Sequence, residues 1–176
     1  MTAITSHFTL QHEIFILDSY LKKPLPTHNK RAFVQGFIDE LLTALRMEPL
    51  APLQIFDAVD NRAPGYSFII PITTSHISGH YFEKPGKHPH IRMDVYSCAS
   101  VNWRKLIMLA DRHLKLGAWH ATFIDRQIGI DGSERLMMDI KGEGADVLDE
   151  SKLLIDNMEL TASRVTRKKV AMASKR

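Results

Sequence analysis

Alternation of apolar and polar residues recurs in short segments of this chain and limits its fold to one built on a β-sheet. Between residues 8 and 20, for example, Leu10, Ile14 and Ile16 fall on one parity, as they would in a strand with one buried face. Alternation returns at residues 91–98. Asp131-Gly132 is a two-residue hairpin signal between two further apolar segments. Together these segments favour a largely antiparallel sheet.

Two other segments have the periodicity of helices. Apolar residues recur at steps of three and four after Asn29 and again after Asn102, and each asparagine can cap the helix that follows it. Pro49 ends the first segment and Gly117 the second. The expected order of elements is β-α-β-β-β-α-β-β. We predict an α+β fold, a two-layer α/β sandwich with two main helices on one face of the sheet.

The chain is expected to consist of one domain and a short appendage. Its 176 residues suit a single compact domain at 1–145, followed at 146–176 by a short helix from Glu150 and a basic C-terminal tail. Six Lys and Arg residues follow the last acidic residue, Glu159; without them, 17 basic and 20 acidic residues leave a net charge of −3 instead of +3. The tail has no aromatic residue that could stack on a base, so we expect a solvated terminus and no nucleic-acid partner.

Composition argues against several other classes of protein. The chain is 44% apolar and 24% charged, an ordinary soluble composition, and no apolar run approaches the roughly 18 residues needed to span a bilayer. Its first residues lack a basic cluster followed by an apolar segment, so we expect neither a signal peptide nor a membrane partner. The single cysteine, Cys98, excludes an internal disulfide and suits the cytoplasm, which is the expected location.

The segment from Thr73 to His80 has an unusual content for a strand. It carries four hydroxyl groups and two imidazoles but only one aliphatic side chain. Because buried polar groups must find partners, these residues alone leave three interpretations open: a polar surface strand, a nucleophile with its base, or a metal site. His76 and His80 have a spacing that suits zinc on a helix, whereas the residue types here favour a strand, and no metal is expected.

The same stretch resembles the bacterial-type S-adenosylmethionine decarboxylases, a pyruvoyl-dependent family. In that family a Gly-x-Ser strand leads into Glu-Ser-His-(Ile/Leu)-(Ser/Thr)-x-His-Thr-Trp-Pro-Glu and then into Asp-(Ile/Val/Leu)-Phe-Thr-Cys-Gly. The spacing from Ser67 through Ser75 to His80 matches without a gap, Cys98 is reached with a short insertion, and the resemblance extends over residues 8–142. The corresponding sequences are Gly65-Tyr66-Ser67, Thr74-Ser75-His76-Ile77-Ser78-Gly79-His80 and Asp94-Val95-Tyr96-Ser97-Cys98.

The resemblance implies an enzyme that cleaves its own chain. Ser75 would attack the carbonyl group of Thr74, and after cleavage between them residue 75 would become a pyruvoyl group, the covalent cofactor. Ser67 and His80 would assist this step by hydrogen bonding and proton transfer. Cys98 would later protonate the substrate carbon as a general acid. In relatives of this length two protomers pair and share active sites, so we also expect a homodimer.

The chain departs from the family near the scissile bond and at the substrate positions. Thr74 stands where the family has a glutamate. The aromatic residue that stacks on adenine falls on Asn61 by ungapped count, and Phe56 could replace it only if the strand register or loop differs. After the motif histidine, Trp-Pro-Glu is replaced by a segment that contains Phe82 and Glu83, so the ribose-binding glutamate is either Glu83, shifted by one residue, or lost.

These observations lead to one main hypothesis and two alternatives. The main hypothesis is a pyruvoyl-dependent decarboxylase of the S-adenosylmethionine type, processed between Thr74 and Ser75, in polyamine biosynthesis. The substrate departures leave open a decarboxylase of another amino acid, such as ornithine or arginine. The departure at Thr74 leaves open an unprocessed, non-catalytic relative that acts as a binding or regulatory protein.

Overall fold

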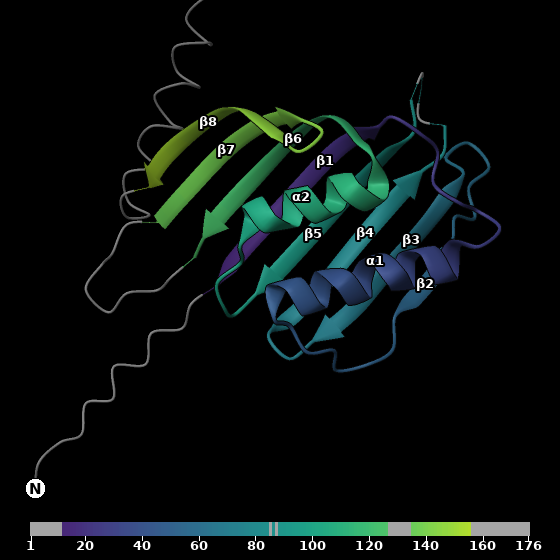
Figure 1. Ribbon diagram of the computed structural model, residues 1–176, viewed down its shortest axis with the longest axis horizontal. Helices are drawn as coiled ribbons and strands as arrows, with labels where there is room; N and C mark the ends of the chain where they lie inside the picture. Colours follow the sequence, from purple (N-terminus) through teal and green to yellow (C-terminus); the bar gives the residue numbers. More distant parts are fainter. Residues whose placement is uncertain (1–11, 85, 87, 127–134, 156–176) are drawn as a thin grey trace, which may run out of the picture.

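Two helices lie across one face of a broad antiparallel sheet (Figure 1). The computed structural model describes residues 12–84, 86, 88–126 and 135–155. Within these ranges the sheet has eight strands in the order β2-β3-β4-β5-β1-β6-β7-β8, and each neighbouring pair is antiparallel. The predicted α+β sandwich, with both helices on one face, is therefore confirmed.

The observed order is β-α-β-β-β-β-α-β-β-β, with one more strand between the helices and one more at the end than predicted. The helices are α1 (Lys30–Leu45) and α2 (Trp103–Leu114). The strands are β1 (Glu13–Leu21), β2 (Gln54–Asp57), β3 (Gly65–Ile72), β4 (Ser75–Phe82), β5 (His90–Ser97), β6 (Leu116–Asp125), β7 (Arg135–Glu143) and β8 (Asp146–Ile155).

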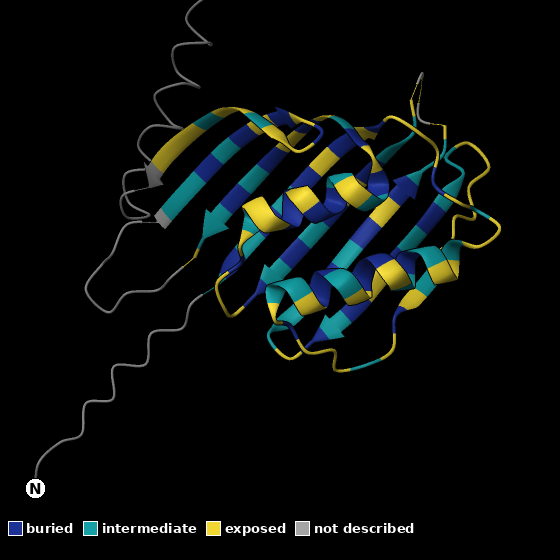
Figure 2. Ribbon diagram, in the orientation of Figure 1, coloured by how far each residue is buried: buried dark blue, intermediate teal, exposed yellow. Residues whose placement is uncertain are grey.

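The two faces of the sheet differ because alternate residues of each strand are covered by the helices. In β1 the buried parity is the opposite of the predicted one: Phe15 and Leu17 are fully buried under the helices, whereas Ile14 and Ile16 are half-buried on the other side. Figure 2 shows the resulting stripes of buried residues along the strands. We call the side without helices the open face. It carries the polar members of the alternating pattern, including the imidazoles at 76 and 80.

The helices start where the sequence predicts, but their ends differ in detail. The side chain of Asn102 accepts a hydrogen bond from the Lys105 backbone N–H at 3.0 Å, whereas Asn29 precedes α1 without making such a cap. α2 ends at Leu114, because Lys115 takes a left-handed conformation, so Gly117 does not close the helix and lies in β6. No helix in the described ranges is long and apolar enough to cross a membrane.

The C-terminal part of the sheet corrects one prediction. Residues 146–155 form β8, which pairs with β7. The prediction of a helix from Glu150 is therefore wrong for residues 150–155. The sheet therefore continues beyond the boundary placed at residue 145. The predicted hairpin turn at Asp131-Gly132, the start of the first predicted strand before His12, and the tail from 156 lie outside the described residues.

Candidate active site

The Thr74–Ser75 bond lies where the chain turns from β3 into β4, and its backbone is strained. Ser75 has a φ of 147°, a region that side chains with a Cβ atom rarely occupy. The other two non-glycine residues with positive φ in the described ranges, Arg46 and Lys115, end helices in the ordinary left-handed conformation. Such a conformation at Ser75 costs about 1–3 kcal/mol and persists only when the surroundings enforce it.

The surroundings hold Thr74 at two atoms. The backbone N–H of Cys98 donates to the Thr74 carbonyl oxygen at 2.8 Å, and the hydroxyl of Ser97 donates to Thr74 Oγ1 at 3.2 Å. Ser75 pairs with Ser97 across β4 and β5, which brings these residues together although they are distant in sequence. We call Thr74, Ser75, Ser97 and Cys98 the cleavage cluster, after the bond that the sequence predicts to be cleaved. A carbonyl oxygen that already accepts a hydrogen bond from a fixed N–H is stabilised when negative charge develops on it.

Three ring side chains surround this cluster on the open face. Ser75 Oγ lies 3.2 Å from His76 Nδ1, and the imidazole of His76 meets the ring of Tyr96 edge-on. His12 stacks on Tyr96, with its Nδ1 2.9 Å from the tyrosine hydroxyl. The same nitrogen is 3.6 Å from the Sγ atom of exposed Cys98. His12 has no local signal that marks it as a site residue, because 86 positions separate it from Cys98.

A second group of predicted site residues lies further along β3 and β4. Ser67 and His80 are directly opposite each other, and Ser67 Oγ is 2.8 Å from His80 Nδ1. Phe56 pairs with Ser67 from the edge strand β2, and its ring is 58% exposed. We call Ser67, His80, Phe56, Phe82 and Glu83 the Ser67–His80 cluster.

The remaining members of this cluster follow His80 along the chain. Phe82 shares the face of His80, and its ring centroid is 4.7 Å from that of His90. Glu83 is half-buried just beyond the end of β4, where its backbone N–H donates to Pro64. Asn61, in contrast, is exposed in the turn between β2 and β3. The strand register therefore brings Phe56, and not Asn61, beside Ser67.

The two clusters are separate within one chain. Ser75 and His80 are five positions apart on the same strand, which corresponds to about 16 Å at 3.3 Å per residue. His76 and His80 are similarly separated, by about 13 Å, and the described residues contain no group of three or more potential metal ligands from His, Cys, Asp and Glu. Ser67 and His80 therefore do not reach Ser75 of their own chain.

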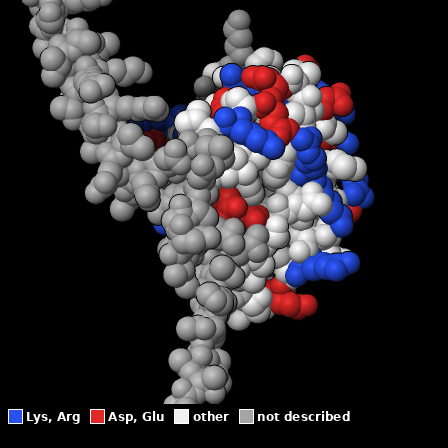
Figure 3. Space-filling view, turned by 90° about the vertical axis from the view of Figure 1, so that its left-hand side faces the viewer, with Lys and Arg blue, Asp and Glu red and all other residues white. Residues whose placement is uncertain are grey.

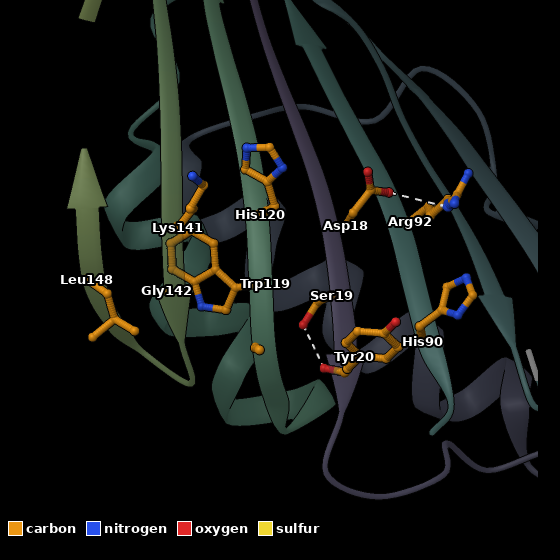
Figure 4. A pocket seen from close by; sticks show the side chains of 11 residues that line it. Asp18, Ser19, Tyr20, His90, Arg92, Trp119, His120, Lys141, Gly142 and Leu148 are labelled. Atoms are coloured by element: carbon orange, nitrogen blue, oxygen red, sulfur yellow. Dashed lines mark hydrogen bonds and ion pairs between the residues drawn. The ribbon is translucent and has the colours of Figure 1, made fainter. Parts of the chain in front are cut away.

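A pocket of about 550 Å³ opens on β1, β5, β6 and β7 (Figure 4). Tyr20 and His90 lie on one side of it, together with the Asp18–Arg92 ion pair at 3.4 Å, and His120 and Lys141 lie on the other. His90 is at the opposite end of β5 from Ser97, about 23 Å along the strand. The pocket is thus remote from the cleavage cluster.

Some charged groups of the described surface form ion pairs. Acidic and basic side chains are intermixed in the part of the surface that is visible in Figure 3. Ion pairs join Arg112 to Glu40 between the helices and Arg104 to Glu150 between α2 and β8. The pKa of His90 is lowered, first by burial and then by the nearby guanidinium of Arg92.

Comparison with known families identifies the chain. A profile of the S-adenosylmethionine decarboxylase family matches residues 15–127, which is more than half of the chain. The chain belongs to the S-adenosylmethionine decarboxylase family. The matched segment contains both the cleavage cluster and the Ser67–His80 cluster, so the family resemblance predicted from the motifs is confirmed at the level of the family. No curated protein matches the chain in a direct sequence search.

Proposed function

We propose that this member of the S-adenosylmethionine decarboxylase family is a pyruvoyl-dependent decarboxylase that cleaves its own chain between Thr74 and Ser75. The observation that carries the proposal is the geometry of that bond. Ser75 has a strained φ of 147°, and the Thr74 carbonyl accepts a hydrogen bond from the Cys98 N–H. Strain raises the energy of the intact bond, and the N–H stabilises charge on the carbonyl oxygen during attack, so both lower the barrier to cleavage.

The proposed cleavage uses atoms that the cluster brings together. The Ser75 hydroxyl oxygen bonds to the Thr74 carbonyl carbon, the bond from that carbon to the Ser75 nitrogen breaks, and the hydroxyl proton ends on the freed amine. The resulting ester then loses the carboxylate of residues 1–74 by β-elimination, with loss of the α-proton of residue 75. Hydrolysis of the dehydroalanine that remains releases ammonia and leaves a pyruvoyl group on residue 75.

The cleavage cluster fits this cofactor, because the residue that would carry it is at the start of a strand beside a thiol and two imidazoles. A pyruvoyl group holds a substrate amine and accepts electrons when carbon dioxide leaves. Cys98 would return a proton to the substrate carbon, with its thiol held against His12. Cys98 is the only cysteine of the chain. The proposal includes a cytoplasmic location, because a thiol remains reduced there.

A homodimer with shared sites is part of the proposal. Ser67 and His80 lie about 16 Å from Ser75 along the sheet but on the same open face as His76 and Tyr96. A two-fold pairing of two open faces can set the cleavage cluster of one chain opposite the Ser67–His80 cluster of the other. The proton transfer that His80 is expected to assist would then act between chains.

The proposed substrate is S-adenosylmethionine, in polyamine biosynthesis. Phe56 offers an exposed ring beside Ser67 for stacking on a base, and Phe82 and Glu83 follow His80 where a ribose could be bound. The assay that decides the substrate is release of labelled carbon dioxide from S-adenosylmethionine, compared with ornithine and arginine. Greater release from either amino acid would exclude S-adenosylmethionine as the preferred substrate.

Intact mass spectrometry of the purified protein tests cleavage. We expect fragments of residues 1–74 and 75–176, a single uncut chain for Ser75→Ala, and normal cleavage but poor turnover for Cys98→Ala. A native chain that remains at 20.0 kDa would refute the proposal.

Co-expression tests the shared site separately. His80→Ala alone should remain uncut, and it should be cleaved when it is co-expressed with Ser75→Ala, because the partner then supplies the missing imidazole. If the mixture remains uncut while the native chain cleaves, the sites are not shared in this way.

One observation supports a second candidate function. Thr74 replaces the glutamate of the family motif with a neutral side chain. A relative that has lost cleavage could act instead as a binding or regulatory protein, and the same mass measurement distinguishes the two functions.

A further inference from the structure

Ser97 is a buried polar residue whose hydroxyl bonds to the side chain of Thr74, next to the proposed scissile bond. Its exposed fraction is 0%, in a strand whose other residues on that face are apolar. The hydroxyl oxygen accepts from the Ala99 backbone N–H at 3.0 Å and donates to Thr74 Oγ1 at 3.2 Å. A buried hydroxyl without partners is costly, so these two bonds fix its orientation.

The bond to Thr74 complements the one made by the next residue. Cys98 holds the Thr74 carbonyl oxygen through its N–H at 2.8 Å, and Ser97 holds the Thr74 side chain. Two attachments on different atoms of Thr74 prevent the residue from rotating as a whole. The direction of the carbonyl group is thereby fixed relative to Ser75, whose own backbone is strained.

This arrangement depends on the residue that departs from the family motif. Thr74 has a short side chain with one hydroxyl, and Ser97 is directly across the sheet from Ser75, so a serine hydroxyl reaches it. We infer that Ser97 is a positioning residue for self-cleavage: its bond to Thr74 Oγ1 keeps the scissile carbonyl on the Cys98 N–H while Ser75 attacks. The inference rests on the proposed function and adds the residue that this chain uses to orient the bond.

Rates of cleavage test the inference through four variants. Ser97→Ala and Thr74→Val each remove one side of the bond with little change in volume, and each should slow the appearance of the 75–176 fragment by about 3- to 10-fold. The double variant should be no slower than either single one, because both changes remove the same interaction. Ser97→Thr keeps the hydroxyl and should restore most of the native rate.

Matched controls separate this role from a general loss of packing. Ser19 is also a buried strand serine with a bonded hydroxyl, but it lies at the far end of β1. Ser19→Ala should leave the cleavage rate unchanged, and thermal unfolding should show all variants folded. Native cleavage rates in Ser97→Ala or Thr74→Val, or a double variant slowed by the product of the two effects, would overturn the inference.

A second measurement decides the inference without any cleavage. In an uncut Ser75→Ala chain, hydrogen exchange of the Cys98 amide reports its bond to the Thr74 carbonyl. Adding Ser97→Ala or Thr74→Val should accelerate that exchange several-fold, whereas Ser19→Ala should not. If the native chain does not cleave, the proposed function fails but this exchange still tests the positioning. Unchanged hydrogen exchange of the Cys98 amide would refute the positioning role of Ser97 without bearing on the proposed function.

Discussion

The strain assigned to Ser75 predicts an unusual response to glycine. Alanine and glycine at this position both prevent cleavage, but only glycine adopts a φ of 147° without a Cβ clash. Relief of about 1–3 kcal/mol of strain exceeds the roughly 0.5–1 kcal/mol that glycine costs in a strand. Ser75→Gly should therefore be more stable than Ser75→Ala by about 0.5–2 kcal/mol, and each kcal/mol raises the melting temperature by about 2–4 °C in a chain of this size.

The measurement is urea unfolding of both variants at one fixed protein concentration, since a dimer would make the transition depend on concentration. Ser78 provides the matched control, because it lies in the same strand with an ordinary φ. There glycine should be less stable than alanine by about 0.5–1 kcal/mol. If glycine is also the less stable residue at position 75, the backbone there is not strained, and the main support for self-cleavage is lost.

Three further predictions concern groups that are buried or half-buried. Tyr66 is 2% exposed and its hydroxyl has no hydrogen-bond partner among the described residues, so Tyr66→Phe should raise the free energy of unfolding by about 1 kcal/mol. Tyr81→Phe should lower it by a similar amount, because the Tyr81 hydroxyl accepts from the Leu25 N–H at 3.1 Å; equal effects in urea unfolding would contradict this reasoning. The lowered pKa of His90 means that the unfolded chain binds its proton more readily, so stability should fall as the pH decreases through the range near 6.5. His90→Gln should flatten that part of the stability profile, and an unchanged slope would assign it to other groups.

Local sequence patterns predicted most of the helices and strands, because each kind of element repeats its apolar residues at a characteristic spacing. The alternation in β1 identified the strand, but its buried face carries Phe15 and Leu17 and not the predicted Ile14 and Ile16, because the position of the helices decides which face is covered. The end of the chain was different. Residues 150–155 were predicted as the start of a helix but pair with β7, since an available sheet edge outweighs weak local propensity.

The candidate site residues differ in how far the sequence alone identifies them. Ser67, Ser75, His80 and Cys98 were identified from motif spacing, which is a property of the sequence. His12 was not, because its approach to Cys98 depends on strand pairing between distant segments.

The sequence alone determined the two helices, most of the strands, the two-layer architecture and the family motif around Ser75. Only the tertiary structure decided how these residues group. The register of β3, β4 and β5 places Thr74 against Ser97 and Cys98, and places Phe56 and His80 beside Ser67, about 16 Å away along β4. Register depends on contacts between strands that are far apart in the chain, and no local pattern of residues specifies such contacts.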